Sequence, residues 1–273
     1  MDHRGEREGE RAGTRTRAMR LAAMLGLVAC LVAAGAGITY LVRMHLDAER
    51  ERGYGSTDPV ATTSESDPEG RVDNPVDFGE LKEKNADIFA WLTIPGTDIN
   101  APVLQSATDD TYYLTHDRYG NESLYGALFT QLANSTDFSD PVTVIYGHDV
   151  DMDSDGVLFY NLHQFEDEEF FKGHEEMTIA TPGHLLTYRI IAAYEYDDRH
   201  ILNSFNFSDQ AVLQEYYDSV LHPTSLRAWV REGATLDASK DKIVQMSTCM
   251  LDQYHGPNRY IVTGVLVNDQ LTW

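Results

Sequence analysis

The sequence predicts a mainly β domain, either a barrel or a sandwich, with flanking helices and an apolar segment ahead of it. Short apolar or alternating runs recur from residue 91 onward and are separated by turn residues. Two longer stretches instead carry apolar residues at helical spacing. With 273 residues, 42% of them hydrophobic, the chain can form one sizeable domain plus extra segments rather than two full domains.

The apolar segment, Leu21 to Val42, is predicted to be a transmembrane anchor. It runs 22 residues without a charge, which is about 33 Å as a helix against a hydrocarbon core of roughly 30 Å. Arginines are more frequent before it than after it, so residues 1–20 are expected to be a cytoplasmic tail. A cleaved signal peptide is the alternative, because Ala34-Gly35-Ala36 can serve as a cleavage site. The apolar run continues past that site, which favours the anchor.

Residues 43–76 are predicted to be a stalk, and residues 77–273 the folded domain, which the anchor would place outside the cell. The stalk is rich in Ser, Thr, Asp, Glu, Gly and Pro and shows no apolar period. The net charge is −23 for the whole chain, and the part after residue 43 has 14 basic and 40 acidic residues. Such a surface repels nucleic acid, so no nucleic-acid partner is expected.

The elements of the domain follow from the pattern in chain order. Apolar residues from Phe78 to Phe89 predict a first helix, and two extended runs follow, broken by Pro95-Gly96. Further helices are predicted over 158–171 and over 208–221, the latter with Ser208 as N-cap. The remaining strands are predicted at 127–129, 142–146, 177–180, 185–194, 242–247 and 260–267.

The C-terminal hairpin holds the first candidate for chemistry. The chain has two cysteines, Cys30 inside the predicted anchor and Cys249 at the end of a predicted strand. The strand that returns begins at Arg259, so the two side chains are expected to face each other. A neighbouring cation favours the thiolate, and a guanidinium can hold the oxyanion that forms when a thiolate attacks an acyl carbon. A buried, inert cysteine is the alternative.

His148 is the candidate acid or base, because it closes the predicted strand "VTVIYGH" at the point where a loop begins. His255 is an alternative base in a Gly-Pro loop. The other histidines considered, His163, His174 and His184, show no zinc-ligand spacing and are interpreted as structural or surface residues.

An acidic run after His148 offers a competing interpretation as a calcium loop. Asp151, Asp153 and Asp155 have the spacing of the first three ligands of such a loop. The twelfth position is Leu162, where a bidentate Glu is required, and the ninth is Phe159. We therefore predict no metal site and no cofactor.

These motifs together resemble a known family. "VIYGHD", "MSTC" and an arginine ten residues after the cysteine are similar to the sortases, and the length of the match points to class B. The similarity runs from about Phe78 to Val267 and includes "WLTIPGTDINAPVLQ" and "LFYNLHQFEDEEFFKGHEEMTIATP". Members often have Thr-Leu where this chain has Gln245-Met246, and an aromatic residue where it has Leu251. Those differences concern substrate preference rather than the chemistry.

The resemblance implies a membrane-anchored cysteine transpeptidase on a closed eight-stranded barrel, working at the outer face of a Gram-positive cell. Cys249 would attack a Thr-Gly or Thr-Asn type bond in the sorting signal of a surface protein, His148 would protonate the leaving amine, and Arg259 would stabilise the oxyanion. Ser247 and Thr248, which precede the cysteine, would contact the substrate. An amine of a cell-wall precursor or a pilin lysine would then resolve the thioester.

Two alternatives to transpeptidation stay open at this point. An anchored extracellular domain that binds a wall polymer or a partner, with an idle cysteine, is separated from an enzyme by thiol reactivity. A cysteine protease that releases its product to water is separated by whether product formation depends on an amine.

Overall fold

The structure is a computed structural model that describes residues 30–43, 45–46, 70–150, 157–250 and 256–273. The chain divides into two compact units, residues 1–46 and 47–273. In the first unit residues 30–43 are helical and exposed. Within the described ranges, none of the helices has both the length and the apolarity that a bilayer crossing needs. Residues 21–29 of the predicted anchor lie outside the described residues, so the anchor stays a prediction.

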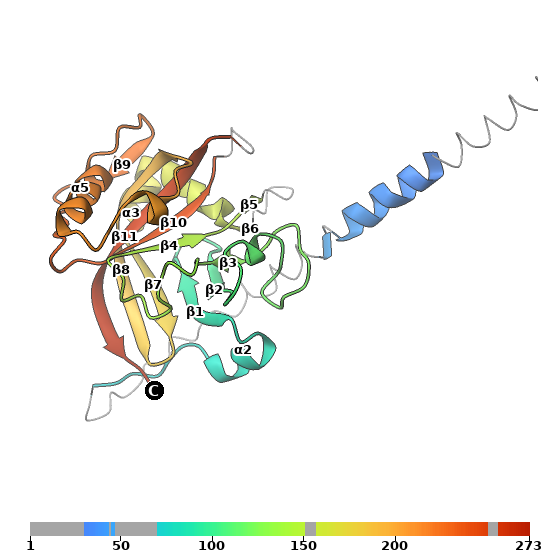
Figure 1. Ribbon diagram of the computed structural model, residues 1–273, viewed down its shortest axis with the longest axis horizontal. Helices are drawn as coiled ribbons and strands as arrows, with labels where there is room; N and C mark the ends of the chain where they lie inside the picture. Colours follow the sequence, from blue (N-terminus) through green and yellow to red (C-terminus); the bar gives the residue numbers. More distant parts are fainter. Residues whose placement is uncertain (1–29, 44, 47–69, 151–156, 251–255) are drawn as a thin grey trace, which may run out of the picture. The chain divides into compact units, whose positions relative to one another are not determined.

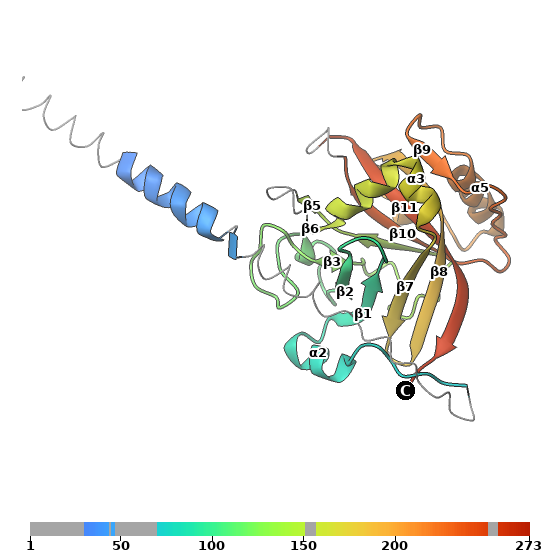
Figure 2. The same ribbon diagram turned by 180° about the vertical axis from the view of Figure 1, so that it is seen from behind.

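The second unit is a closed β-barrel (Figures 1 and 2). Among the described residues, eight strands pair in the order β11-β10-β4-β3-β2-β1-β7-β8, and pairing of β8 with β11 closes the ring. This confirms the closed eight-stranded barrel that the resemblance implied. The strands are β1 (Ile88–Thr93), β2 (Asn100–Leu104), β3 (Leu128–Phe129), β4 (Val142–Tyr146), β7 (Glu176–Thr181), β8 (His184–Asp197), β10 (Ile243–Cys249) and β11 (Asn258–Leu271).

In the described part of the chain, three short strands lie outside the ring. β9 (Ala228–Val230) pairs with β8 only, and β5 (Asp149–Val150) pairs with β6 (Val157–Leu158) as a separate ribbon. Within the ring, β10 runs parallel to β4 and β2 parallel to β3, whereas the other neighbours are antiparallel. The parallel β4–β10 pair brings the carboxyl ends of two strands to one edge of the barrel.

The first predicted helix is shorter than expected. α2 (Phe78–Lys84) ends at Asn85, and the last two residues of the predicted helix, Ile88 and Phe89, begin β1 instead. The run IFAWLT is buried on both faces of the strand, because α2 covers one face and the barrel interior receives the other. A continuous apolar run fits both a helix and a buried strand, and pairing of β1 with β2 decides between them.

The predicted helix over 158–171 is two elements. A 3-10 helix, η2 (Phe159–Glu166), is followed by α3 (Glu168–Gly173), and the side chain of Asp167 accepts a hydrogen bond from the Phe170 amide to cap α3. α5 (Gln210–Leu221) is capped by Asp209, which accepts from two amides of the first turn, and not by the predicted Ser208. η1 (Tyr112–Leu114) and α4 (Ile201–Ser204) were not predicted.

α5 is attached to the cysteine strand through a buried glutamine. The Tyr216 hydroxyl donates to Gln245 Oε1 at 2.6 Å, and Gln245 Nε2 donates to the Tyr194 hydroxyl at 3.1 Å and to Thr263 Oγ1 at 3.2 Å. Gln245 is fully buried. A buried amide needs these partners, so this side chain fixes α5 and three strands together rather than contacting a substrate.

The end of the predicted stalk packs on the domain. The Val72 amide donates to the Leu271 carbonyl at 3.1 Å. The Asn74 side chain donates to the Thr181 carbonyl at 2.8 Å and to Thr272 Oγ1 at 3.0 Å. Contacts with the folded domain thus begin a few residues ahead of residue 77, where the domain was predicted to start.

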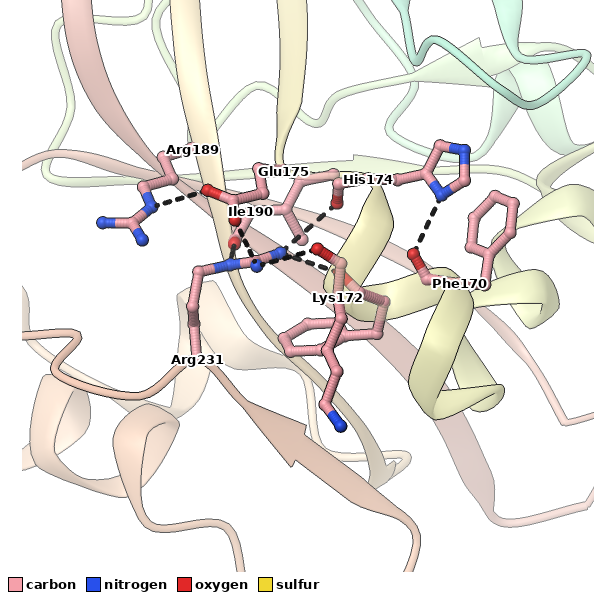
Figure 3. Close-up of polar contacts among 8 residues, drawn as sticks. Phe170, Lys172, His174, Glu175, Arg189, Ile190 and Arg231 are labelled. Atoms are coloured by element: carbon pink, nitrogen blue, oxygen red, sulfur yellow. Dashed lines mark hydrogen bonds and ion pairs between the residues drawn. The ribbon is translucent and has the colours of Figure 1, made fainter.

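A buried arginine joins β9 to α3 and β8 (Figure 3). Arg231 is 9% exposed, and its guanidinium lies over the Phe171 ring at 4.7 Å. Glu175 Oε1 is 3.0 Å from Nη1, and desolvation lowers the pKa of the guanidinium from its ordinary value. The main-chain carbonyls that it reaches are those of Ile190 at 2.8 Å, Phe171 at 2.8 Å, His174 at 3.4 Å and Lys172 at 3.5 Å.

Arg231→Met should therefore destabilise the domain by about 2–4 kcal/mol, because buried carbonyls would lose their donors. Arg189→Met is the matched control, since the half-exposed side chain of Arg189 forms an exposed ion pair with Glu175 at 3.5 Å, worth about 0–1 kcal/mol. Urea unfolding of both variants measures the difference. Equal midpoints for the two variants would show that Arg231 does not hold these elements together.

Candidate active site

Two of the three residues predicted to do chemistry are paired at the barrel edge, and the third follows the neighbouring strand. Cys249 is the last residue of β10 and pairs with Arg259 of β11, as the sequence predicted. On the other side of β10, Ser247 pairs with Tyr146 of parallel β4, and the Gly147 amide donates to the Ser247 carbonyl at 3.2 Å. His148 lies two residues past the end of β4, and Cys249 lies two residues past Ser247 on β10. Residues opposite each other in neighbouring strands project from the same face.

His148 is held at this edge by tight packing and by one hydrogen bond. A Cβ at Gly147 would lie 2.5 Å from a Leu128 methyl carbon and 2.8 Å from the Phe159 ring, so only glycine fits between β3 and η2. His148 Nε2 lies 2.9 Å from the Leu114 carbonyl oxygen. Since a carbonyl only accepts, Nε2 carries the hydrogen, and Nδ1 is the nitrogen available for proton transfer in the neutral ring.

The guanidinium of Arg259 is oriented by its own loop. Nη1 donates to the main-chain carbonyls of Gly256 and Asn258, each at 2.9 Å. Two bonds from one nitrogen fix the plane of the group. On the far side of Arg259, β8 contributes Tyr196 at the paired position.

Cys249 is a free, half-buried thiol. Burial raises the pKa of this thiol, the carboxylate of Asp149 raises it further, and Arg259 lowers it. The thiolate is therefore a minor species near neutral pH, and its fraction grows as the pH rises through the elevated pKa. Asp149 itself is desolvated, which raises the pKa of its carboxyl group against the opposing effects of His163, His148 and Arg259.

Asp149→Asn should lower the pKa of the Cys249 thiol and make its alkylation by iodoacetamide severalfold faster at pH 7, because one carboxylate that opposes ionisation is removed. Asp269→Asn is the matched control, since Asp269 is an exposed residue near the other end of β11. The alkylation rate of Cys249, measured from pH 6 to pH 10, should rise at lower pH in Asp149→Asn than in the parent. Asp269→Asn should match the parent. An unmoved profile would contradict this electrostatic account.

Comparison with known proteins assigns the family. A family model described as a sortase domain matches residues 92–267. Sortase B of Listeria monocytogenes is 30% identical over 190 residues, which is 69% of this chain and 73% of that protein. The chain belongs to the sortase family. Its resemblance to class B is confirmed, and, since sortases are cysteine transpeptidases, the chain is an enzyme that acts on peptide bonds.

Solved sortase structures share the fold. Clostridium perfringens sortase B is 26% identical with a TM-score of 0.61, over 70% of this chain and 100% of that chain. A Streptococcus pyogenes class B sortase involved in pilus biogenesis is 29% identical with a TM-score of 0.57, over 70% of this chain and 98% of that chain.

The remaining predicted residues of this sortase lie as follows. Ser247 and Thr248 are 6% and 3% exposed, and their contact with a substrate stays a prediction. His255, Leu251 and the acidic run from Asp151 to Asp155 lie outside the described residues. Met246, like Gln245, is fully buried, so the departure from the family's Thr-Leu lies in the core.

Two residues beside the cysteine were not singled out from the sequence. Asp149 directly follows His148 in "YGHD", so its place was readable from the motif. His163, interpreted as structural or surface, is 9% exposed, and its Nε2 lies 3.0 Å from the Cys249 carbonyl oxygen. That contact joins residues 86 positions apart, and no local pattern signals it.

Proposed function

We propose that this sortase cleaves the C-terminal sorting signal of a surface protein and transfers the acyl group to an amine. The observation that carries the proposal is the pairing of Cys249 with Arg259 across β10 and β11, at the barrel edge where the parallel strand β4 leads into His148. A nucleophile, a proton donor and a fixed oxyanion partner are the groups that acyl transfer through a thioester requires.

In the first half of the reaction the Cys249 thiolate attacks the scissile carbonyl carbon. The carbon–sulfur bond forms first and puts negative charge on the carbonyl oxygen, which the guanidinium of Arg259 faces. The carbon–nitrogen bond then breaks as His148 gives a proton to the departing amine. In the second half an acceptor amine attacks the thioester, a new amide bond forms as the thiolate leaves, and His148 takes back the proton that the amine loses. No electrons are gained or lost overall, so the cycle needs no redox partner.

The scissile bond is proposed to be of the Thr-Gly or Thr-Asn type, and the acceptor an amine of a cell-wall precursor or a pilin lysine. The Streptococcus pyogenes relative involved in pilus biogenesis supports the second acceptor, and the general resemblance to class B supports the first. Either acceptor must approach as the neutral amine, because an ammonium has no lone pair for attack.

The test of transfer uses the full-length protein in detergent with quenched fluorescent peptides that contain Thr-Gly or Thr-Asn bonds. Triglycine and a lysine-containing pilin-type peptide serve as acceptors. A new amide product that increases with acceptor concentration is the expected result. Hydrolysis products alone, at every acceptor concentration, would indicate a protease, and no cleavage together with an unreactive Cys249 would indicate a binding domain.

We also propose that residues 21–42 anchor the enzyme with its barrel outside the cell, on the length and charge asymmetry of that segment. Protease added to cells without their wall should then degrade the domain and leave a membrane-bound fragment of the first residues. A protected domain, or a mature chain that begins after Ala36, would refute the anchor.

A further inference from the structure

A buried histidine lies behind the cysteine. His163 of η2 stacks on the Tyr260 ring of β11 with the ring centroids 5.0 Å apart. Its Nδ1 is 2.6 Å from Glu166 Oε1, and its Nε2 is 3.0 Å from the main-chain carbonyl oxygen of Cys249. Asp149 Oδ2 lies 3.9 Å from the same Nε2, and the two side chains are 5% and 9% exposed.

The partners of the ring define its hydrogens. A carbonyl oxygen only accepts, so Nε2 must donate to Cys249. Glu166 Oε1 lies within hydrogen-bond distance of Nδ1, and an ionised carboxylate only accepts. A ring that donates from both nitrogens is an imidazolium, and the carboxylates of Glu166 and Asp149 supply the negative charge that a buried cation requires.

The hydrogen bond from His163 to the Cys249 carbonyl lies where β10 is still paired with β11 but no longer with β4. The β4–β10 register ends at Ser247, whereas the β10–β11 register continues to Cys249. The carbonyl of Cys249 points away from those ladders to η2, an element from a distant part of the chain. A fixed carbonyl fixes the peptide plane that follows the cysteine, and with it the direction of the Cα–Cβ bond that carries the thiol.

We propose that His163 is a positioning residue for the transpeptidase, which as an imidazolium holds the main chain of Cys249 and offsets the charge of Asp149 beside the thiol. The groups that face it are Glu166 from η2, Asp149 from β5, Cys249 from β10 and Tyr260 from β11. Among the cations that act on Asp149, His163 has a larger effect than His148 or Arg259. Its loss would leave the Asp149 carboxylate, which raises the pKa of the Cys249 thiol, less compensated.

Two substitutions at His163 distinguish the effect of its hydrogen bond to the Cys249 carbonyl from the effect of its positive charge. A glutamine amide nitrogen reaches about as far as histidine Nε2, so His163→Gln keeps a donor for the Cys249 carbonyl and loses the charge. His163→Leu loses both. His174→Gln is the matched control, because His174 also stacks on an aromatic ring, that of Phe170 at 3.8 Å, and bonds a main-chain carbonyl at 2.9 Å, but does so at the end of α3.

The full-length protein in detergent is assayed for peptide cleavage and for iodoacetamide alkylation of Cys249 from pH 6 to pH 10. His163→Leu should lower kcat about tenfold, the effect of losing one hydrogen bond to a charged group, with KM nearly unchanged. His163→Gln should recover most of kcat. Both variants should slow alkylation at pH 7, and His174→Gln should change neither measurement.

A structural role alone would lower the melting temperature of His163→Leu and leave its kcat and alkylation profile at the parent values, which would overturn the proposal. If His163→Leu does not fold, nitrogen-15 NMR of the parent protein decides. Two protonated ring nitrogens in His163 at pH 7 are expected, and a ring with one protonated nitrogen would contradict the imidazolium.

Discussion

Cys249→Ala should abolish peptide cleavage and thioester formation, leaving no turnover above the uncatalysed background. The thiolate is the atom to which the acyl group is bound between the two halves of the reaction, and alanine offers no substitute. The side chain is half-buried and makes no disulfide, so the loss of one sulfur atom should change stability little compared with its effect on rate. Cleavage of a quenched fluorescent peptide measures the loss.

Cys30→Ala is the matched control for that variant. Cys30 is the other free cysteine of the chain and is exposed on the helix over 30–43. We expect its replacement to leave turnover at the parent level. Full turnover by Cys249→Ala, or loss of turnover in Cys30→Ala, would show that the nucleophile has been wrongly assigned.

Arg259→Lys should lower the turnover rate about 100-fold to 1,000-fold, the usual effect of removing one oxyanion donor. Nη1 of Arg259 is bound to the Gly256 and Asn258 carbonyls, so the guanidinium plane is fixed with respect to Cys249 on the paired strand position. Lysine keeps the charge but places it on a flexible stem without the planar fork. Charge alone should therefore be insufficient.

Arg189→Lys provides the comparison for a strand arginine without a proposed role, because Arg189 makes an exposed ion pair with Glu175. It should keep the parent rate. Thermal melting of both lysine variants should stay close to that of the parent, which would separate a catalytic defect from unfolding. Turnover of Arg259→Lys within about threefold of the parent, against the expected 100-fold loss, would remove Arg259 from the active site.

Much of the barrel was readable from local pattern. β4 was predicted with its observed bounds, because an apolar run between turn residues leaves few alternatives, and the β10–β11 hairpin follows from two apolar runs on either side of a Gly-Pro turn. Ile88 and Phe89 were assigned to a helix because their spacing fits α2, and only pairing with β2 makes them a strand. The local spacing of apolar residues carries no information about which strand will pair with the segment.

The candidate active site likewise contains residues that the sequence indicated and a contact that it did not. Cys249 and Arg259 stand at strand ends and His148 follows one, so the sequence indicated them, and the β10–β11 register pairs Cys249 with Arg259. The contact of His163 with the Cys249 carbonyl joins η2 to β10 across 86 residues, and it depends on how η2 packs over the barrel. Such a contact has no period or motif, and only the folded structure reveals it.

The central claim is that acyl transfer proceeds through a thioester on Cys249. Intact-protein mass spectrometry tests this most directly when the full-length protein is mixed with a sorting peptide without an acceptor amine. The account predicts a mass increase equal to the N-terminal part of the peptide, mapped to Cys249 by digestion and removed when triglycine or a lysine-containing peptide is added. An adduct on another residue, or a transfer product that forms with no adduct on Cys249, would contradict it.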